Sequence, residues 1–537
     1  MPAMSPRRQT ALLFLLTLVA LLPGIGAATG ITGKDEFFLG LRTPMEMLAS
    51  DHWLVPFLDG VPRIRKPPLL YWLGSLSFAA FGPSLVSARV VAVLFGALLV
   101  VAAAGIARRL GGDVRTGLGS GLILLGCLGL HSEGRRFMLD IPVAALSTAA
   151  FWSALVWLDR RRWPWLTLTA LLLAAGFLVK GPIVALVCGG GLAALLLSGR
   201  LAPASLRRHG PALAANGALL LALALPWFLI VRRLYPEALH QVLADELESR
   251  QFLHLSPEIM LGLINVALPW VFVFLAGAWQ RRRERGLPRL LLLWFLLTFL
   301  PFLFLRSFDR YLVGALVPLA IFLALSLDGL RSPWPFRLGA AVALLLGGGL
   351  AAFAFWFHLG GWFWLPLPAA YLAWSWWRPA RVAPGHVFAA PLVFWIAVLA
   401  GVFPALGVNA VPAAVVELGR QRTIALFDGP QPALLPILTQ QPHRHYASLD
   451  RHDVSELAAL DALIFAEGKD VPQLRAAIRD AGYEAVPAGG YATLASHGSG
   501  LRFARVGATA ADWRAALDSR QLDPLRTRIE WFSVNKP

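Results

Sequence analysis

The chain has 537 residues, of which 57% are hydrophobic and only 15% are charged. A soluble protein carries about a quarter charged residues, so the composition excludes an ordinary soluble enzyme. The formal net charge is +17, but the arginines form short clusters between apolar blocks and no basic face, which argues against nucleic-acid binding. Cys127 and Cys188 both fall inside apolar blocks, which predicts buried thiols and no disulfide.

About thirteen apolar stretches follow one another along the chain, and a stretch of this kind crosses a hydrocarbon core of about 30 Å. They cover residues 11–29, 88–108, 115–131, 138–158, 163–180, 181–199, 211–234, 259–279, 287–305, 310–328, 337–358, 361–377 and 386–406. The first resembles a cleaved signal peptide, but the many spans behind it favour an uncleaved helix. The sequence therefore predicts a polytopic α-helical membrane domain over residues 1–406.

Clusters of arginine mark alternate loops of this predicted domain. They are Arg7–Arg8, Arg108–Arg109, Arg160–Arg161–Arg162, Arg207–Arg208, Arg281–Arg282–Arg283 and Arg378. Because loops rich in arginine stay on the cytoplasmic side, these loops and the N-terminus are predicted to be cytoplasmic. The loops 30–87 and 235–258, and everything after 406, are then predicted to lie outside. An odd number of spans places the two ends of the chain on opposite sides of the membrane, which agrees with this orientation.

The tail from 407 to 537 has a different composition and is predicted to be a soluble, periplasmic α/β domain. Its elements are expected as strands over 423–428, 444–448 and 461–466, and as helices over 431–440 and 471–482, the second closed by Gly482. Strands that alternate with helices favour a mostly parallel sheet. The histidines His443, His445 and His452 are best interpreted as scattered surface residues, because no metal-binding spacing accompanies them.

The first outer loop, 30–87, is too long and too rich in apolar and charged residues for a simple connector. Its segments 35–50 and 68–81 are typical of amphipathic helices that lie on a membrane surface. An acidic pair, Asp35-Glu36, follows the first span, and Lys66 precedes a Pro-Pro pair that fixes the backbone. A carboxylate can take a proton from an acceptor hydroxyl, and a cation can hold a leaving phosphate. Together they suit a transferase with a lipid-linked phosphate donor, although each residue taken singly also fits an interfacial anchor.

Short motifs in a fixed order continue along the predicted membrane domain. They are Asp35-Glu36, Glu46-Met47-Leu48, Trp53-Leu54-Val55-Pro56, Lys66-Pro67-Pro68-Leu69-Leu70-Tyr71-Trp72, Phe81-Gly82, Ala88-Arg89, Arg135 to Asp140, Lys180-Gly181-Pro182, Leu225-Pro226-Trp227, Glu246 with Arg250, Leu268-Pro269-Trp270, and Arg310-Tyr311 with Pro318. In order and loop placement they resemble the polyprenyl-phosphate-dependent membrane glycosyltransferases of the GT-C class. That class includes protein-mannosyltransferase-like enzymes and the lipid A aminoarabinose transferases, and the resemblance covers about residues 10–405.

The resemblance implies an inverting glycosyltransferase of the bacterial inner membrane that acts at the periplasmic face. Its donor would be a sugar on a polyprenyl phosphate such as undecaprenyl phosphate, and its acceptor lipid A, another glycan or a protein. The implied residues are the catalytic Asp35, Glu36 and Asp140, the donor phosphate ligands Arg65, Lys66, Arg135, Arg136, Lys180, Arg310 and Tyr311, and the sugar or acceptor contacts Trp227, Glu246 and Arg250.

The acidic pair leaves two registers for the catalytic base. Asp35 lies one residue farther from Glu46 than the family's acid does, so Glu36 is an alternative. Adjacent positions of a helix point to different sides, so only one of them can face the site, and Asp35 is favoured. Asp140 also has a second interpretation, as an ion-pair partner that orients the neighbouring Arg135 and Arg136.

Two departures from the aminoarabinose enzymes concern a metal. Arg65 stands where those enzymes have a glutamate implicated in metal binding, and Leu247 stands where they have a histidine beside Glu246. We therefore expect no divalent metal here, and the departures also speak against aminoarabinose as the sugar.

Two other functions fit a multi-pass membrane protein. A transporter or flippase of lipid-linked sugars would place its charges near the bilayer midplane in repeated halves. The chain has no evident internal repeat, and its candidate charges cluster at one face, which favours the enzyme. A non-catalytic scaffold, with the tail as a binding module, does not explain the dense motifs of the first outer loop.

Overall fold

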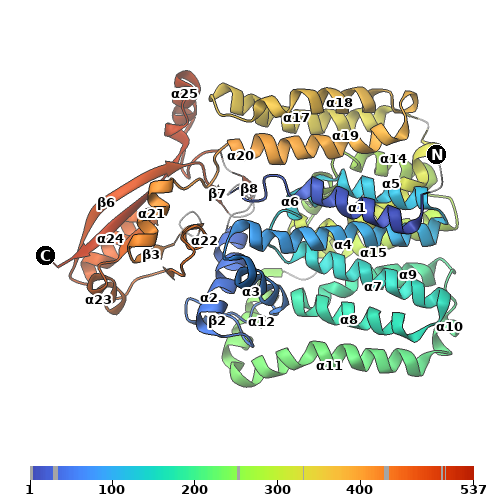
Figure 1. Ribbon diagram of the computed structural model, residues 1–537, viewed down its shortest axis with the longest axis horizontal. Helices are drawn as coiled ribbons and strands as arrows, with labels where there is room; N and C mark the ends of the chain where they lie inside the picture. The colour runs from blue at the N-terminus through green and yellow to red at the C-terminus, as the bar shows by residue number, and fades with distance from the viewer. Residues whose placement is uncertain are drawn as a thin grey trace.

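A computed structural model describes residues 4–27, 34–250, 254–330, 332–428, 434–497, 500–501 and 503–536. Figure 1 shows a bundle of long helices with a smaller, sheet-containing part beyond one end. The helices of the bundle are α1 (Pro6–Leu21), α4 (Leu85–Gly111), α5 (Val114–Leu125), α6 (Leu128–Glu133), α7 (Asp140–Arg160), α8 (Trp163–Lys180), η2 (Gly181–Val184), α9 (Ala185–Leu197), α10 (Pro203–Arg207), α11 (Gly210–Leu234), α12 (Pro236–Arg250), α13 (Ile259–Ala267), α14 (Val271–Arg281), α15 (Leu287–Phe299), η3 (Leu300–Phe304), η4 (Asp309–Ala315), α16 (Leu316–Ser326), η5 (Leu327–Gly329), α17 (Trp334–Trp356), η6 (Trp362–Trp364), α18 (Pro366–Trp377), η7 (Pro379–Arg381), α19 (Pro384–Ile396), η8 (Ala397–Val402) and α20 (Phe403–Ala405).

Among the described residues, eight helices are long and apolar enough to cross a membrane, and the pair α13 and α14, bent by 107°, would make a ninth. This count takes α8, η2 and α9 as one stretch. The chain turns back within it at Gly181, whose φ of +75° favours glycine. The Arg161 side chain before α8 hydrogen-bonds the Ser205 hydroxyl beyond α9 at 2.6 Å, so the stretch passes through the bundle twice. Every predicted span contains at least one helix, and the total of about thirteen stays a prediction.

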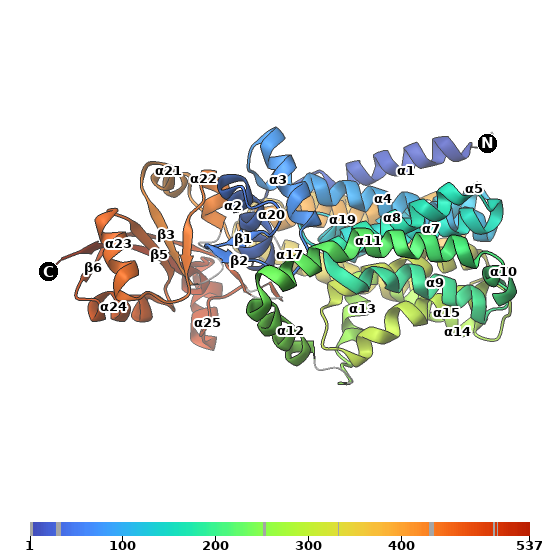
Figure 2. The same ribbon diagram turned by 90° about the horizontal axis from the view of Figure 1, so that it is seen from below.

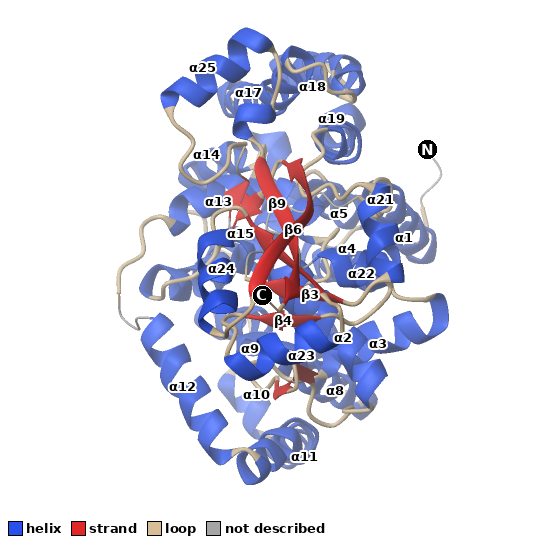
Figure 3. Cartoon of the chain, turned by 90° about the vertical axis from the view of Figure 1, so that its left-hand side faces the viewer, coloured by secondary structure: helices blue, strands red, loops and turns tan. Residues whose placement is uncertain are grey.

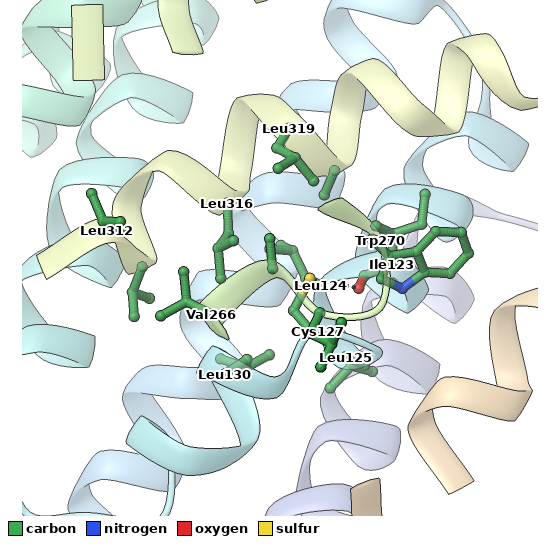
Figure 4. Packing of buried hydrophobic residues seen from close by; sticks show 14 of the residues in the cluster. Ile123, Leu124, Leu125, Cys127, Leu130, Val266, Trp270, Leu312, Leu316 and Leu319 are labelled. Carbon is green, nitrogen blue, oxygen red and sulfur yellow. Dashed lines mark hydrogen bonds between the residues drawn. The ribbon is translucent and has the colours of Figure 1, made fainter. Parts of the chain in front are cut away.

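The interior of the bundle is apolar and closely packed. Gly105 of α4 leaves room for the Trp152 ring of α7, because a Cβ at this position would lie 2.3 Å from that ring. Around Cys127, leucine side chains of neighbouring helices fill the space beside Trp270 (Figure 4). Cys127 and Cys188 are buried free thiols, as predicted.

The first outer loop carries short elements at the end of the bundle that faces the sheet (Figure 1). They are η1 (Lys34–Leu41), α2 (Arg42–Ser50), the hairpin strands β1 (Phe57–Leu58) and β2 (Val61–Pro62), and α3 (Leu69–Phe81). The helices predicted over 35–50 and 68–81 are confirmed. The first differs in one respect, because η1 is π-helical and only α2 is a regular α-helix.

The tail forms a five-stranded sheet in the order β4-β3-β5-β9-β6, with helices on both faces (Figure 3). Its elements are α21 (Ala413–Gln421), β3 (Ile424–Phe427), α22 (Leu435–Thr439), β4 (Arg444–Tyr446), α23 (Arg451–Ala459), β5 (Leu463–Glu467), α24 (Val471–Asp480), β6 (Glu484–Thr493), the hairpin β7 (Ser496–His497) and β8 (Gly500–Leu501), α25 (Ala510–Ser519), η10 (Asp523–Leu525) and β9 (Thr527–Asn535). Side chains of α23 and α24 pack on one face, and those of α21 and α22 pack on the other.

The three predicted strands and the helix over 471–482 are confirmed, and Gly482 ends that helix with a φ of +86°. The other predicted helix, 431–440, lies partly outside the described residues, and α22 occupies its end. The prediction of a mostly parallel sheet is wrong. β3 pairs with β4 and β5 in parallel, but β9 pairs with β5 and β6 antiparallel. The sequence of β6 hides this strand, because a proline and two glycines interrupt its apolar pattern.

Candidate active site

A chain of alternating charges joins four elements at the junction of the bundle with the sheet. The Arg310 guanidinium of η4 lies 2.7 Å from the Asp35 carboxylate of η1 and 3.4 Å from the Asp140 carboxylate. Asp140 also forms an ion pair with Lys180. Three of the four side chains are almost completely buried, whereas the Asp35 side chain keeps 33% of its surface exposed. Asp35 is therefore the acid of this group that an incoming molecule can reach.

Two of these charged side chains lie at the ends of helices, which position them. Asp140 lies in the first turn of α7, where the helix dipole favours an anion. Lys180 lies in the last turn of α8, where the dipole favours a cation, and the turn at Gly181 directs the chain away. The two helices pack against each other, so these opposite ends bring the ion pair together.

The structure corrects the expected pairing of Asp140 with the neighbouring arginines. The Arg136 guanidinium contacts Glu133 at 3.0 Å, and Asp140 contacts Lys180 and Arg310. Arg135 donates hydrogen bonds to the carbonyls of Ala20 and Pro23, near the end of α1. Arg135 thus fixes the first helix, and neither arginine lines the cavity described below.

Glu36 faces away from Asp35 and is completely buried. Both of its carboxylate oxygens lie 2.8 Å from the Arg89 guanidinium, and the Phe137 backbone N–H donates a further bond at 2.8 Å. Burial raises the pKa of Glu36, but Arg89 with the other positive and N–H groups outweighs burial and holds that pKa below its ordinary value. Glu36 is therefore a charged structural partner of Arg89.

A cavity of about 730 Å³ opens beside the charge chain. Its polar lining consists of Lys66, Lys180, Glu246, Arg250, Arg306, Ser307 and Tyr311, and the rest of its lining is apolar, mainly from η2, α9, α12, α15 and η3. The Lys180 ammonium lies 3.6 Å from the centre of the Tyr311 ring, a cation–π contact. The arrangement can hold an anionic group against the polar wall and an apolar chain against the rest.

A second set of charges closes the cavity from α12, which continues from the end of α11 (Figure 2). The Glu246 carboxylate lies 2.7 Å from the Lys66 ammonium and 3.2 Å from the Arg250 guanidinium. Burial lowers the pKa of Lys66, and the Glu246 carboxylate opposes that shift only in part. Burial raises the pKa of Glu246, but Lys66 and Arg250 outweigh it, so the net shift is downward. Glu246 is thus an anion whose place a phosphate could take.

The residues around Glu246 do not fit a metal ion. The Arg65 guanidinium lies 3.4 Å from Glu246 and 3.7 Å from Asp245, so a cation already occupies the place of a metal-binding acid. Leu247 of α12 is exposed and offers no ligand. In the part of the chain that the structure describes, no group of three or more His, Cys, Asp or Glu side chains could hold a metal.

Trp227 lies away from the cavity and is buried. Its indole N–H donates to the Leu54 carbonyl at 3.0 Å, and its ring packs with Val55 and Ile64 of the first outer loop. In this position it anchors the loop and presents no open ring face to a sugar.

The tail is attached to the first outer loop by Arg42 and Asp59, which the sequence did not single out, and by the backbone of His443 and His445. The expectation that these histidines are surface residues is wrong for His443, which is buried. Arg42 of α2 forms an ion pair with Asp59 and donates to the His443 carbonyl at 3.2 Å. Asp59 also accepts a hydrogen bond from the His445 backbone at 3.0 Å. The attachment places β4 directly beside α2. No local motif marks it, because its partners lie about four hundred positions apart.

Arg89 belongs to the Ala88-Arg89 motif, but nothing in that motif predicts its ion pair with Glu36. A buried arginine within an apolar span is costly and therefore usually has a specific partner. That cost is the signal that could have connected Arg89 with an acid of the outer loop.

Known proteins resemble this chain in sequence and in fold. A family model described as dolichyl-phosphate-mannose-protein mannosyltransferase matches residues 65–230. An undecaprenyl phosphate-alpha-4-amino-4-deoxy-L-arabinose arabinosyl transferase of Sodalis glossinidius is 31% identical in an alignment of 351 positions that covers 59% of this chain and 61% of that protein. The transferase of the same description from Pseudomonas aeruginosa PAO1 is 31% identical in an alignment of 382 positions that covers 65% of each chain.

The crystal structure of ArnT from Cupriavidus metallidurans bound to undecaprenyl phosphate superposes with a TM-score of 0.68, at 18% identity and 97% coverage of both chains. Its apo form gives the same TM-score over 87% of this chain and 93% of that one. The alignment with the Sodalis glossinidius transferase covers 61% of the length of that protein, so this chain matches about three fifths of it. The matches confirm the resemblance to the polyprenyl-phosphate-dependent GT-C glycosyltransferases and the shared fold.

Proposed function

We propose that this chain is an inverting glycosyltransferase that moves a sugar from a polyprenyl phosphate to an acceptor hydroxyl at the periplasmic face of the bacterial inner membrane. The observation that carries the proposal is the Asp35–Arg310–Asp140–Lys180 charge chain beside a cavity with one cationic wall and apolar remaining walls. A lipid-linked sugar phosphate has the same division, with an anionic centre and a long apolar chain.

Asp35 is the proposed general base. Its side chain is the accessible acid of the charge chain, whereas the carboxylates of Glu36 and Asp140 are buried against cations. Its carboxylate takes the proton of the acceptor hydroxyl as that oxygen attacks the anomeric carbon. The bond from this carbon to the phosphate oxygen breaks on the opposite side, so the configuration inverts and the polyprenyl phosphate leaves with one additional negative charge.

Lys180 and Arg310 are proposed to stabilise that departing charge. Both are buried, Lys180 in the lining of the cavity and Arg310 in the adjoining ion pair with Asp140, and a fixed buried cation interacts with an anion more strongly than it does in water. Asp140 contacts both of them and holds them in place, a positioning role. Lys66 and Arg250 extend the cationic wall toward the mouth of the cavity, with Glu246 as the anion that the donor phosphate displaces.

The site lies at one end of the bundle, and the buried chain of alternating charges belongs to it. A flippase needs charged or polar groups along a path through the bilayer, and the charge chain at a single end favours chemistry at one face. In the orientation predicted from the arginine clusters, about thirteen spans place the N-terminus in the cytoplasm and residues 407–537 in the periplasm as a separate domain.

Mass spectrometry of the cell envelope tests the proposal. Glycolipids and glycoproteins are compared between cells that contain the protein, cells that lack it, and cells that contain only the Asp35→Asn variant. We expect one pentose or hexose mass increment, on lipid A, another glycan or a protein, that is present only with the unaltered chain. An envelope of identical composition in all three strains contradicts the proposal.

A further inference from the structure

A second cavity, of about 580 Å³, lies far from the candidate active site. Four arginines contribute to its lining, Arg115, Arg337, Arg378 and Arg381. They come from the start of α5, the start of α17 and the connection between α18 and α19. We call this cavity the arginine pocket.

The arginine pocket lies at the opposite end of the bundle from the candidate active site. α7 begins at Asp140 in the charge chain and ends beside an ion pair between Asp159 and Arg109. α5 starts just after Arg109, and its Val114 carbonyl accepts a hydrogen bond from Gln9 at the start of α1. The 21 residues of α7 separate the two ends by about 30 Å, the thickness of a hydrocarbon core. Figure 1 shows α5 and α10 at this end, away from the sheet.

The charge of the pocket is of one sign. Within the described residues, its lining contains the four arginines and no acidic residue. Arg337 is held in place, because its Nε donates to the Trp377 carbonyl at 2.9 Å and its guanidinium lies over the rings of Trp334 and Trp377. Both tryptophans are more than half exposed, as in the aromatic belt at a membrane surface. The pocket thus faces the lipid boundary with a net positive rim.

The floor of the pocket is apolar, with Phe336, Leu330 and Phe388 among its residues. A guanidinium binds a phosphate through two parallel hydrogen bonds, which suits the rim. A small soluble phosphate would use the rim and leave the apolar floor in contact with water. A phospholipid uses both parts, and anionic lipids are attracted to basic pockets between helices on the cytoplasmic side.

We propose that the arginine pocket binds an anionic phospholipid of the cytoplasmic leaflet, with the phosphate on the arginines and the first part of an acyl chain on the apolar floor. The site is independent of the charge chain, and its place in the cytoplasmic leaflet rests on the proposed orientation of the chain. Bound lipid would tie α5, α17 and α19 together at the membrane surface.

Native mass spectrometry of the full-length protein in detergent tests this inference with dioleoylphosphatidylglycerol and dioleoylphosphatidylcholine. The double variant Arg378→Gln, Arg381→Gln removes two rim charges. The double variant Arg207→Gln, Arg208→Gln is the matched control, because these exposed arginines lie at the same end but outside the pocket. We expect the pocket variant to bind phosphatidylglycerol about tenfold more weakly, the control to bind as the unaltered chain does, and phosphatidylcholine to bind weakly to all three.

Equal loss of phosphatidylglycerol in both variants would overturn the inference, because it would show a general charge effect without a site. Undiminished binding by the pocket variant would overturn it too. A further arm adds glycerol phosphate at the same concentration as the lipid. Displacement of half of the lipid or more would show that the soluble head group binds as tightly as the whole lipid, and would overturn the assignment to a lipid.

Discussion

The carboxylate of Asp35 and the guanidinium of Arg310 lie 2.7 Å apart, although 275 positions separate them in the sequence. One residue follows the first helix and the other opens a helix late in the bundle. The ion pair therefore exists only when the whole bundle is assembled, and it places the accessible acid at the end of a buried chain of charges. The predictions below test this arrangement and its surroundings.

Arg310→Gln is expected to lower the rate of sugar transfer by about a hundredfold or more, because it removes a fixed cation from a developing anion. The measurement is the initial rate of donor consumption by protein in detergent or nanodiscs. Arg233→Gln, an exposed arginine on α11, is the control and is expected to be fully active. Equal rates for Arg310→Gln and Arg233→Gln would remove Arg310 from the proposed site.

Lys66 and Glu246 are expected to respond differently to neutralisation. Lys66→Gln removes a cation from the cavity wall and should weaken donor binding and lower turnover. Glu246→Gln removes the anion that the donor phosphate displaces, so donor binding should be unchanged or tighter. Titration of each variant with purified lipid-linked donor checks this. If Glu246→Gln loses donor affinity as strongly as Lys66→Gln, the carboxylate contacts the ligand and the proposed displacement is wrong.

Lys180→Gln should lower turnover strongly without a large loss of donor affinity, because Lys180 is proposed to act on the charge that develops as the phosphate leaves. The loss from a single group of this type is about 3 kcal/mol of transition-state stabilisation. Single-turnover measurements separate this effect from binding. A variant with normal turnover and weak donor binding would mean that Lys180 stabilises the bound donor and not the transition state.

Glu36→Gln is expected to destabilise the protein by about 3 kcal/mol, because it leaves the buried Arg89 guanidinium without its anion. The folded-state pKa of Glu36 is lowered below 4.5, so this stability is fully present above pH 4.5 and is lost as the pH falls through the folded-state value. The difference in melting temperature between the unaltered chain and Glu36→Gln should be constant above pH 4.5 and shrink below it. Glu237→Gln, at an exposed position of α12, should show no such difference at any pH.

The orientation can be tested with reporter fusions. Fusions after residues 204 and 283 should report the cytoplasm, and fusions after residues 245 and 520 the periplasm, because arginine clusters occupy the first pair of loops. A cytoplasmic signal from residue 520 would mean that the whole bundle is inverted, because the tail contacts the first outer loop at the same end of the bundle. The candidate active site and the tail would then lie on different sides of the membrane from those proposed.

The sequence predicted most of the helices because each apolar stretch is a local property. It also predicted a site at the first outer loop, and there Asp35, Asp140, Lys180 and Arg310 do come together. Motif order could not separate Asp35 from Glu36. The difference is made by Arg89 and by the Phe137 N–H, which are fixed only by tertiary packing.

Other features depend on contacts that no local pattern encodes. Trp227 follows a proline in a family-like motif, yet its indole anchors the outer loop through the Leu54 carbonyl. β9 pairs antiparallel between β5 and β6, and strand order within a sheet is decided by long-range pairing. The contact of Arg42 with β4 similarly joins two distant segments whose sequences give no sign of each other.

The Asp35→Asn variant tests the central claim most directly. The purified variant and the unaltered chain are incubated in nanodiscs with total polyprenyl-phosphate sugars and envelope acceptor, and the release of free polyprenyl phosphate is followed by mass spectrometry. The amide keeps the shape of the side chain and loses its basicity, so the variant should bind the lipid-linked donor but release no polyprenyl phosphate above background. Release at the rate of the unaltered chain would contradict the assignment of Asp35 as the base and, with it, the proposed mechanism.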